Sequence, residues 1–339
     1  MRIPKAIGIA ALFLLCSFAG CLDVDEDVPE ELEEIRLNHL RMKGSHNSYH
    51  VKTPGVSLYE PTNYTHAGMD EQADLLGVRQ FEMDVWYIPG MGLRVYHYIG
   101  DSNTNCRGFS RCLEVLLNWS TANPNHAPIW IFIEPKDLPQ IVEELDIIEM
   151  IQAELEQTWP RNRTITPSDV RGDSESLREA VVENGWPALE ASRGKALFVM
   201  LDKTEIRDLY VNRYPSLEGQ WMFAIVNEAE PLASIISFVN PESQQERLLN
   251  ATKTGFMVRT RPDFDTVEAR EENYTRFELA LSSGAHFITT DFPGNDHEIQ
   301  YAIWLPDGPV MCNPHTAPEH CTTNMIELQG NYSPPPPTE

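Results

Sequence analysis

Short runs of apolar residues recur along this chain, and most of them lack the polar alternation of a half-exposed strand. Continuous apolar runs of this length are typical of strands buried on both faces, as in a parallel sheet wrapped by helices. We predict strands over residues 40–43, 78–85, 128–134, 196–201, 221–226, 235–239, 255–258 and 287–290.

Helical spacing separates several of these runs. Apolar residues recur at intervals of three and four over 141–155, and helices are also predicted over 112–122 and 266–283. The alternation of strands and helices, without an internal repeat, predicts an α/β fold in which one (β/α) barrel forms a single domain. A doubly wound open sheet is the main alternative, although the chain has no glycine-rich nucleotide loop.

The start of the chain has the pattern of an export signal. Arg2 and Lys5 precede an apolar run, and residues 1–20 are predicted to be a signal peptide because this run is too short for a comfortable membrane span. Ala19-Gly20-Cys21 resembles a lipoprotein cleavage box, with Phe18 where leucine is more usual. We therefore expect a cell-surface lipoprotein anchored through an acylated Cys21, with ordinary secretion as the alternative.

Charge and proline mark the remaining boundaries. Residues 21–37 are predicted to be an acidic tether, 38–325 the barrel domain, and 326–339 a proline-rich disordered tail. The chain has 51 acidic and 26 basic residues, and removal of Arg2 and Lys5 with the signal leaves 51 against 24. Such a surface repels nucleic acid, so we expect no nucleic-acid partner. We also expect a monomer.

Four cysteines remain when Cys16, in the signal, and Cys21 are set aside. An even number in an exported chain predicts disulfides, and three pairings are possible. A zinc site is disfavoured because the short CxxC spacing is absent. The simplest pairing is local. It joins Cys106 to Cys112 and Cys312 to Cys321.

Two carboxylates stand two residues apart on one predicted strand. Glu82 and Asp84 should share a face, because side chains alternate along a strand. Two carboxylates on one buried face repel each other and are costly to desolvate, and a bound cation removes that cost. Calcium suits a site made only of oxygen ligands. The alternative is that both groups lie at a strand end, solvated or paired with arginine.

Another carboxylate ends the next strand. Glu134 closes an apolar run, and Lys136 shares its face. In a barrel the carboxyl ends of the strands hold the active site. Glu134 could therefore join Glu82 and Asp84, while Lys136 could contact an anionic substrate. The alternative is a Glu134–Lys136 pair at the surface.

Two of the ten histidines follow strand-like segments. His46 follows the first predicted strand, and His97 lies in a short β-like segment, 95–97, after the Glu82 strand. Cleavage of a phosphodiester requires one proton to be removed from a nucleophile and another to be supplied to the leaving oxygen. Imidazoles perform both steps near neutral pH. The ordered set of His-Asn, Glu-x-Asp, His and a strand-end Glu favours this chemistry.

This set resembles the calcium-dependent phosphoinositide-specific phospholipase C group of the PI-PLC-like phosphodiesterase superfamily. The resemblance extends from about residue 38 to 293. It rests on the motifs at 44–49, 77–84, 97, 119–120, 133–136, 283–286 and 290–293. The loop between Cys106 and Cys112 also resembles that of the group.

The resemblance implies a distorted TIM barrel and a two-histidine mechanism. It places calcium ligands at Asn47, Glu82, Asp84 and Glu134, and a catalytic pair at His46 and His97. The metal would bind a phosphate oxygen and the inositol 2-hydroxyl and lower the pKa of that hydroxyl. Attack on phosphorus would displace diacylglycerol and form a cyclic inositol phosphate, which water could open. His97 would protonate the leaving oxygen, His46 would stabilise phosphoryl charge, and Glu134 or Glu82 would be the base.

Further candidates follow predicted strands. Lys203, Arg259 and Arg261 could contact phosphate or a ring hydroxyl, and Asp291 could orient a histidine. An ordinary salt bridge is the alternative for each. The expected partner is a phospholipid at a membrane surface, where the anchor at Cys21 would hold the enzyme.

Two other functions compete. A glycerophosphodiester phosphodiesterase would use a similar barrel, but it typically has His-Arg where this chain has His46-Asn47. A non-catalytic surface lipoprotein that binds ligands on the same fold should have lost a histidine or a carboxylate, and none is missing.

Overall fold

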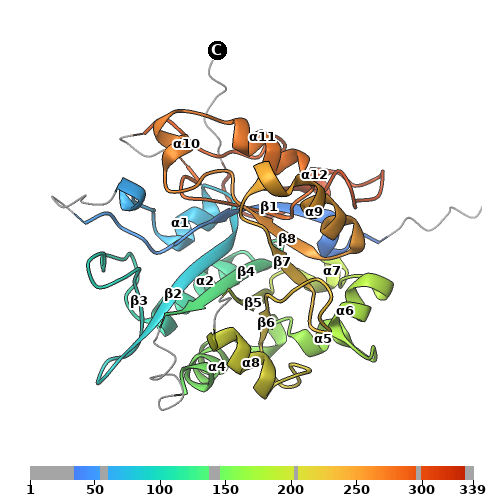
Figure 1. Ribbon diagram of the computed structural model, residues 1–339, viewed down its shortest axis with the longest axis horizontal. Helices are drawn as coiled ribbons and strands as arrows, with labels where there is room; N and C mark the ends of the chain where they lie inside the picture. Colours follow the sequence, from blue (N-terminus) through green and yellow to red (C-terminus); the bar gives the residue numbers. More distant parts are fainter. Residues whose placement is uncertain (1–33, 54–59, 137–145, 202–204, 295–298, 333–339) are drawn as a thin grey trace, which may run out of the picture. The chain divides into compact units, whose positions relative to one another are not determined.

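Eight parallel strands curl into a nearly closed barrel, with helices between most successive strands (Figure 1). The computed structural model describes residues 34–53, 60–136, 146–201, 205–294 and 299–332, which belong to one compact unit. The predictions for the signal peptide, Cys21 and Lys203 lie outside these residues. Within the described part of the chain, no helix is both long and apolar enough to cross a membrane.

The strand order closes the sheet on itself. Neighbours follow the order β6-β5-β4-β2-β1-β9-β8-β7, every neighbouring pair is parallel, and a bridge between Ile225 and Ile235 joins the two ends. The strands are β1 (Leu40–Ser45), β2 (Val78–Ile88), β4 (Ile129–Pro135), β5 (Ala196–Met200), β6 (Met222–Ala224), β7 (Ile235–Ser237), β8 (Met257–Thr260) and β9 (Phe287–Thr290). The barrel prediction is confirmed, and the open doubly wound sheet is excluded.

Two antiparallel strands are added to the barrel. β2 runs three residues past its predicted end and returns as β3 (Gly92–Val95), as Figure 1 shows. The turn contains Gly90 and Gly92, both at positive φ, where a side chain would be strained. β10 (Val310–Cys312) pairs with β1. His97, predicted within a β-like segment, lies just after β3 and is carried by this hairpin.

Helices surround the barrel. They are α1 (Met69–Asp74), α2 (Phe109–Ala122), α4 (Ile147–Thr158), α5 (Pro167–Arg171), α6 (Leu177–Glu179), α7 (Leu189–Ser192), α8 (Glu205–Arg213), α9 (Pro241–Thr254), α10 (Val267–Arg270), α11 (Thr275–Ser282) and α12 (Thr323–Ile326). A π-helix (Ala180–Asn184) and 3₁₀ turns at Leu37–His39, Glu60–Thr62 and Arg161–Arg163 complete them.

The predicted helix over 266–283 is wrong, because it is two helices. Glu272 has a positive φ of 50°, which interrupts α-helical geometry between α10 and α11. The Asn273 side chain accepts a hydrogen bond from the Thr275 amide and so helps to start α11. α9 was not predicted, although Asn240 caps it and Pro241 occupies its first position. Few apolar residues recur at helical spacing in this segment, so its hydrophobic periodicity does not predict a helix.

The barrel interior changes from aromatic to charged along the strand direction. The rings of Trp130 on β4 and Phe287 on β9 meet across it, with centroids 5.0 Å apart. Two residues beyond Phe287 on β9, the Thr289 hydroxyl donates to the Gln80 side chain on β2. Gly44 leaves room for that amide, because a Cβ there would lie 2.0 Å from its oxygen. Carboxylates follow at the next inward positions of β2. The polar groups therefore gather at the carboxyl ends of the strands.

Both ends of the packed unit differ from the prediction. Leu37 is fully buried at the start, although the tether was predicted to reach it. At the other end the tail was predicted from residue 326, yet Ile326 is buried and Glu327 pairs with buried Arg79 at 2.6 Å. A buried guanidinium needs a carboxylate partner, so the chain stays packed beyond the predicted boundary.

Two disulfides have the local pairing. One joins Cys106 to Cys112 across the start of α2, and the other joins Cys312, at the end of β10, to Cys321. The sequence allowed two other pairings, in which Cys106 and Cys112 bond to Cys312 and Cys321, and the structure excludes both.

Removal of the Glu327 charge should destabilise the barrel. We expect Glu327→Gln to lower the free energy of unfolding by about 3 kcal/mol, because Arg79 is left buried without its counter-charge. Urea unfolding checks this. The exposed Glu319→Gln control should leave the midpoint unchanged, and equal effects of the two substitutions would contradict the assignment.

Candidate active site

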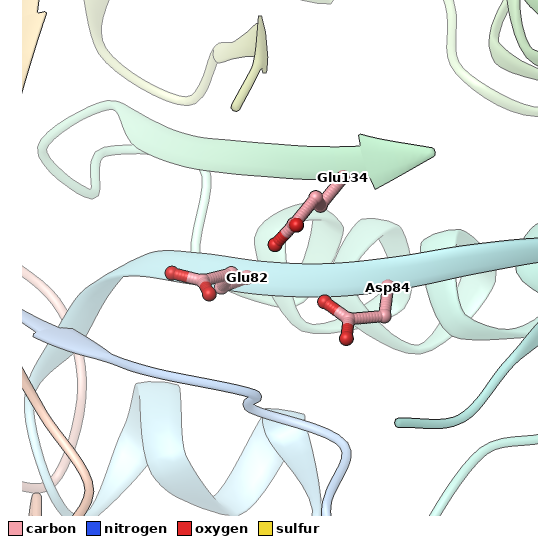
Figure 2. A group of neighbouring side chains, drawn as sticks. All are labelled: Glu82, Asp84 and Glu134. Atoms are coloured by element: carbon pink, nitrogen blue, oxygen red, sulfur yellow. The ribbon is translucent and has the colours of Figure 1, made fainter. Parts of the chain in front are cut away.

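Three carboxylates converge at the carboxyl ends of β2 and β4 (Figure 2). Glu82 and Asp84 alternate along β2 and are each only 1% exposed. The register pairs Asp84 with Glu134 on β4, so the third carboxylate is directed towards β2. One oxygen from each residue lies within 4.8 Å of the other two. The sheet therefore brings together the three acidic residues that the sequence singled out.

Repulsion within this group is strong and only partly relieved. Burial, and then the charge of Glu134, raise the pKa of Asp84 well above its usual value. Among the described residues, no group donates a well-aligned hydrogen bond to either Asp84 oxygen. The Lys136 ammonium lies 3.2 Å from Asp84 and 2.7 Å from Glu134, and although burial opposes it, these two carboxylates raise the pKa of Lys136. A single ammonium thus neutralises two carboxylates only in part. The three residues offer only oxygen ligands, and such a set fits calcium.

The predicted fourth ligand, Asn47, lies in the loop after β1. It is 2% exposed and has a φ of 45°, a left-handed conformation that asparagine tolerates. Its side-chain oxygen accepts a hydrogen bond from the Tyr49 hydroxyl at 3.2 Å. Burial and the nearby charge of Asp84 raise the pKa of Tyr49. The role of Asn47 as a ligand stays a prediction.

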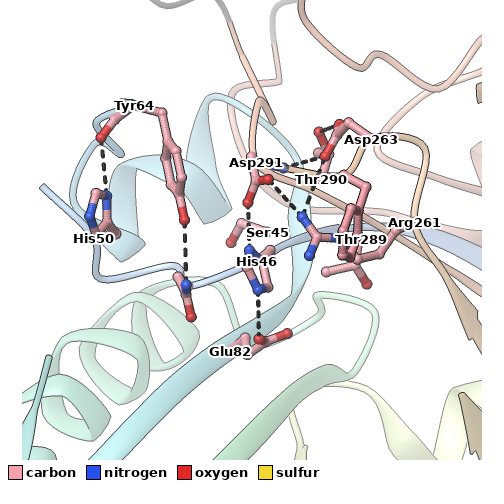
Figure 3. Close-up of polar contacts among 12 residues, drawn as sticks. Ser45, His46, His50, Tyr64, Glu82, Arg261, Asp263, Thr289, Thr290 and Asp291 are labelled. Carbon is pink, nitrogen blue, oxygen red and sulfur yellow. Dashed lines mark hydrogen bonds and ion pairs between the residues drawn. The ribbon is translucent and has the colours of Figure 1, made fainter. Parts of the chain in front are cut away.

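His46 is held between two carboxylates (Figure 3). Its Nδ1 lies 2.5 Å from Asp291 Oδ1, and its Nε2 lies 3.4 Å from Glu82 Oε1. The other Asp291 oxygen accepts a hydrogen bond from Arg261 at 2.6 Å. Burial alone would raise the pKa of Asp291, but Arg261 and then His46 hold it well below its usual value. An ionised Asp291 accepts a hydrogen bond from Nδ1–H and thereby orients the ring.

Arg259 crosses the barrel from β8 to the carboxylate group. It donates to Glu82 Oε2 at 2.6 Å and to the Thr289 hydroxyl at 3.2 Å. Burial would raise the pKa of Glu82, but Arg259 and His46 lower it. For Arg259 and Arg261, the sequence left two alternatives, a substrate contact or a salt bridge. In the structure Arg259 pairs with Glu82 and Arg261 pairs with Asp291. Any role of either in substrate binding stays a prediction.

His97 lies on the exposed side of the site, with 27% of its side chain accessible. Its Nδ1 is 3.1 Å from Asp101 Oδ2, and the same oxygen lies 2.8 Å from Nε2 of buried His50. Burial would raise the pKa of Asp101, but the two histidine contacts lower it to about 2. The Trp86 indole donates to the carbonyls of Tyr96 and His97. Each candidate histidine thus has an aspartate at Nδ1.

Sequence reasoning missed several residues of this network. His50 and Tyr64 belong to no recognised motif, and Asp101 could have been found only through its spacing of four from His97. Asp263 also escaped notice. It accepts hydrogen bonds from the Thr290 hydroxyl and the Asp291 amide, and burial and Asp291 raise its pKa to about 7.

Comparisons with known proteins identify the family and the fold of this chain. A family model described as phosphoinositide phospholipase C, Ca²⁺-dependent, matches residues 88–314. This range includes His97 and Glu134 and begins beyond the two β2 carboxylates. No curated protein matches the chain.

Solved structures share the fold at low sequence identity. A Ca²⁺-dependent phosphatidylinositol-specific phospholipase C from Streptomyces antibioticus is 19% identical, with a TM-score of 0.57 over 76% of this chain and 95% of that chain. A calcium-dependent phosphoinositol-specific phospholipase C from a Gram-negative Pseudomonas species is 16% identical in its apo form, with a TM-score of 0.56 over 82% of this chain and 95% of that chain. Its myoinositol complex is 17% identical, with a TM-score of 0.53 over 76% and 90%.

Asp84→Asn should stabilise the calcium-free protein at neutral pH and abolish its response to calcium. Because the pKa of Asp84 is raised on folding, its ionisation opposes folding increasingly as pH rises through that pKa. The gain should therefore disappear in acid, where Asp84 is protonated. Thermal unfolding with a chelator, from about pH 4 to about pH 8, checks the first effect.

Added calcium should raise the melting temperature of the wild type and leave that of Asp84→Asn unchanged. Exposed Asp173→Asn is the matched control and should respond like the wild type. An equal calcium response in both variants would contradict a site at Asp84.

Proposed function

This chain belongs to the Ca²⁺-dependent phosphoinositide phospholipase C family, and from this premise we propose that it cleaves the phosphodiester bond of phosphatidylinositol-type lipids. The products would be diacylglycerol and a cyclic inositol phosphate, which water then opens. The observation that carries the proposal is the pair of histidine–aspartate contacts at the end of the barrel where the three carboxylates gather.

We propose that Glu82, Asp84, Glu134 and Asn47 hold the calcium ion. Bound there, calcium would supply positive charge that lowers the pKa of the inositol 2-hydroxyl. Lys136 lies beside Asp84 and Glu134, and its ammonium would be free to contact an anionic substrate if these two carboxylates held calcium instead. This links the predicted role of Lys136 in substrate binding to the metal site.

Glu134 is the better candidate for the base. Glu82 is 2% exposed at its side chain and held by Arg259, which lowers its pKa, whereas 30% of the Glu134 side chain is accessible. Glu134 would take the proton of the 2-hydroxyl as the oxygen attacks phosphorus. A weakly basic, buried carboxylate is poorly suited to this step.

The two histidines would act on opposite sides of the phosphate. With Nδ1 bound to Asp101, His97 presents Nε2, from which a proton would pass to the diacylglycerol oxygen as its bond to phosphorus breaks. His46, as the imidazolium paired with Asp291, would stabilise charge on the phosphoryl oxygens. Opening of the cyclic phosphate would reverse the roles, with His97 accepting a proton from water.

We also propose that the protein is exported. Two disulfides in the described part of the chain are typical of an oxidising compartment. The signal peptide at residues 1–20 and the lipid anchor at Cys21 would then place the barrel beside a membrane that contains its substrate. The monomeric state stays a prediction.

Turnover of phosphatidylinositol tests the proposal. With calcium, the purified protein should convert phosphatidylinositol vesicles to a cyclic phosphate that phosphorus NMR detects, and a chelator should stop the reaction. The Glu82→Gln/Asp84→Asn double variant should lose at least about 100-fold in rate. Activity that survives both chelation and the double change would sink the metal mechanism. Turnover of glycerophosphodiesters but not of phosphatidylinositol would identify the chain as a glycerophosphodiester phosphodiesterase instead.

The leaving-group role of His97 has its own test. His97→Ala should lower kcat on phosphatidylinositol by about 10²–10⁴-fold, because the alkoxide leaves without a proton. The loss should be much smaller with a nitrophenyl ester of inositol phosphate, since nitrophenolate is a stable leaving group. Release of nitrophenol measures this. His46→Ala should impair both substrates, and equal losses from the two variants on both esters would assign His97 another role.

A further inference from the structure

We propose that His50, a buried histidine outside the catalytic pair, is a positioning residue that holds Asp101 and, through it, His97. The inference rests on the proposed function, because it concerns how that reaction's acid is oriented. His50 is 0% exposed and follows the loop that contains His46 and Asn47.

The backbone of His50 is held from several directions. Its amide donates to the Asn47 carbonyl at 2.8 Å, and its carbonyl accepts from the His66 amide at 2.9 Å. It also forms a β-bridge with Thr104, which lies beyond the His97 loop. His50 therefore links the segment after β1 to the segment after β3.

The ring continues this link. Nδ1 lies 3.1 Å from the Tyr64 carbonyl, and Nε2 lies 2.8 Å from Asp101 Oδ2, so both nitrogens face oxygen acceptors. The Tyr64 ring packs against it, with centroids 4.5 Å apart (Figure 3). A buried imidazole without partners would destabilise the fold, so these contacts give the ring one orientation.

The His97 segment needs such an anchor because it is exposed. Ile99 is 87% exposed and Tyr98 is 37% exposed, and Asp101 closes the turn by donating its amide to the Tyr98 carbonyl at 2.8 Å. The Asp101 carboxylate points inwards, where one oxygen meets both His50 and His97. A catalytic group on an exposed loop keeps its geometry only if buried contacts fix it.

The side chain of His46 is supported from another side of the barrel. This support runs through Asp291 to Arg261 and Asp263 on the β8–β9 side of the barrel. A change at His50 should therefore disturb His97 and leave His46 in place. This selectivity distinguishes a positioning role from general loss of structure.

Two substitutions separate the two ring contacts. In His50→Asn the amide nitrogen can replace Nδ1 and keep the Tyr64 contact, whereas in His50→Gln it can replace Nε2 and keep the Asp101 contact. We expect His50→Asn to lower kcat on phosphatidylinositol by about 10-fold or more with KM unchanged. His50→Gln should stay within about 3-fold of the wild type. Exposed His315→Asn, far along the chain, is the matched control.

Nitrogen NMR of the histidine rings gives a readout that is independent of turnover. In the wild type and in His50→Gln, His97 should carry its hydrogen on Nδ1, facing Asp101. In His50→Asn and in Asp101→Asn, His97 should become a mixture of tautomers while the His46 signals stay unchanged. Asp101→Asn provides the comparison if His50→Asn does not fold.

The outcomes decide between the roles. Equal losses of kcat and melting temperature in the two His50 variants, with unchanged His97 signals, would overturn the inference and leave His50 a structural residue. A neutral wild-type His97 whose single hydrogen is on Nε2 would overturn it as well. If the wild type fails to cleave phosphatidylinositol, the proposed function fails, and the ring signals alone then uphold or overturn the positioning role.

Discussion

Buried charge at the carboxyl end of the barrel is the constraint on which the rest of the structure depends. Glu82 and Asp84 project into an interior where desolvation of a carboxylate is costly, so cations must lie beside them. Arg259 reaches across from β8 and Lys136 approaches from the end of β4. The barrel can close around its own acidic residues only because these strands bring opposite charges to the same level.

That balance is incomplete, and the imbalance makes the site suitable for a metal. Glu82 pairs with the guanidinium of Arg259, whereas Asp84 and Glu134 share the ammonium of Lys136. The pKa values follow this division, since that of Glu82 is lowered and that of Asp84 is raised. Asp84 and Glu134 therefore attract a further cation, and Glu82, at the edge of the same group, also contacts His46.

The two histidines are supported in different ways. His46 stands at the end of a barrel strand among packed groups, and Asp291, Arg261 and Asp263 hold it from β8 and β9. His97 stands on an exposed loop, and its support comes from an aspartate four residues along the chain. The packed barrel interior thus supports His46, and the β2–β3 extension carries His97.

The sequence by itself determined the strands and the faces of the site residues, because a strand buried on both faces needs a continuous apolar run and alternation puts Glu82 and Asp84 together. It also indicated the local disulfides. Only the tertiary structure decided the break at Glu272, the packing of residues 326–332, and the partners of each charge. Arg259 meets Glu82 across 177 positions of sequence because barrel closure and register set that contact, and no local period encodes it.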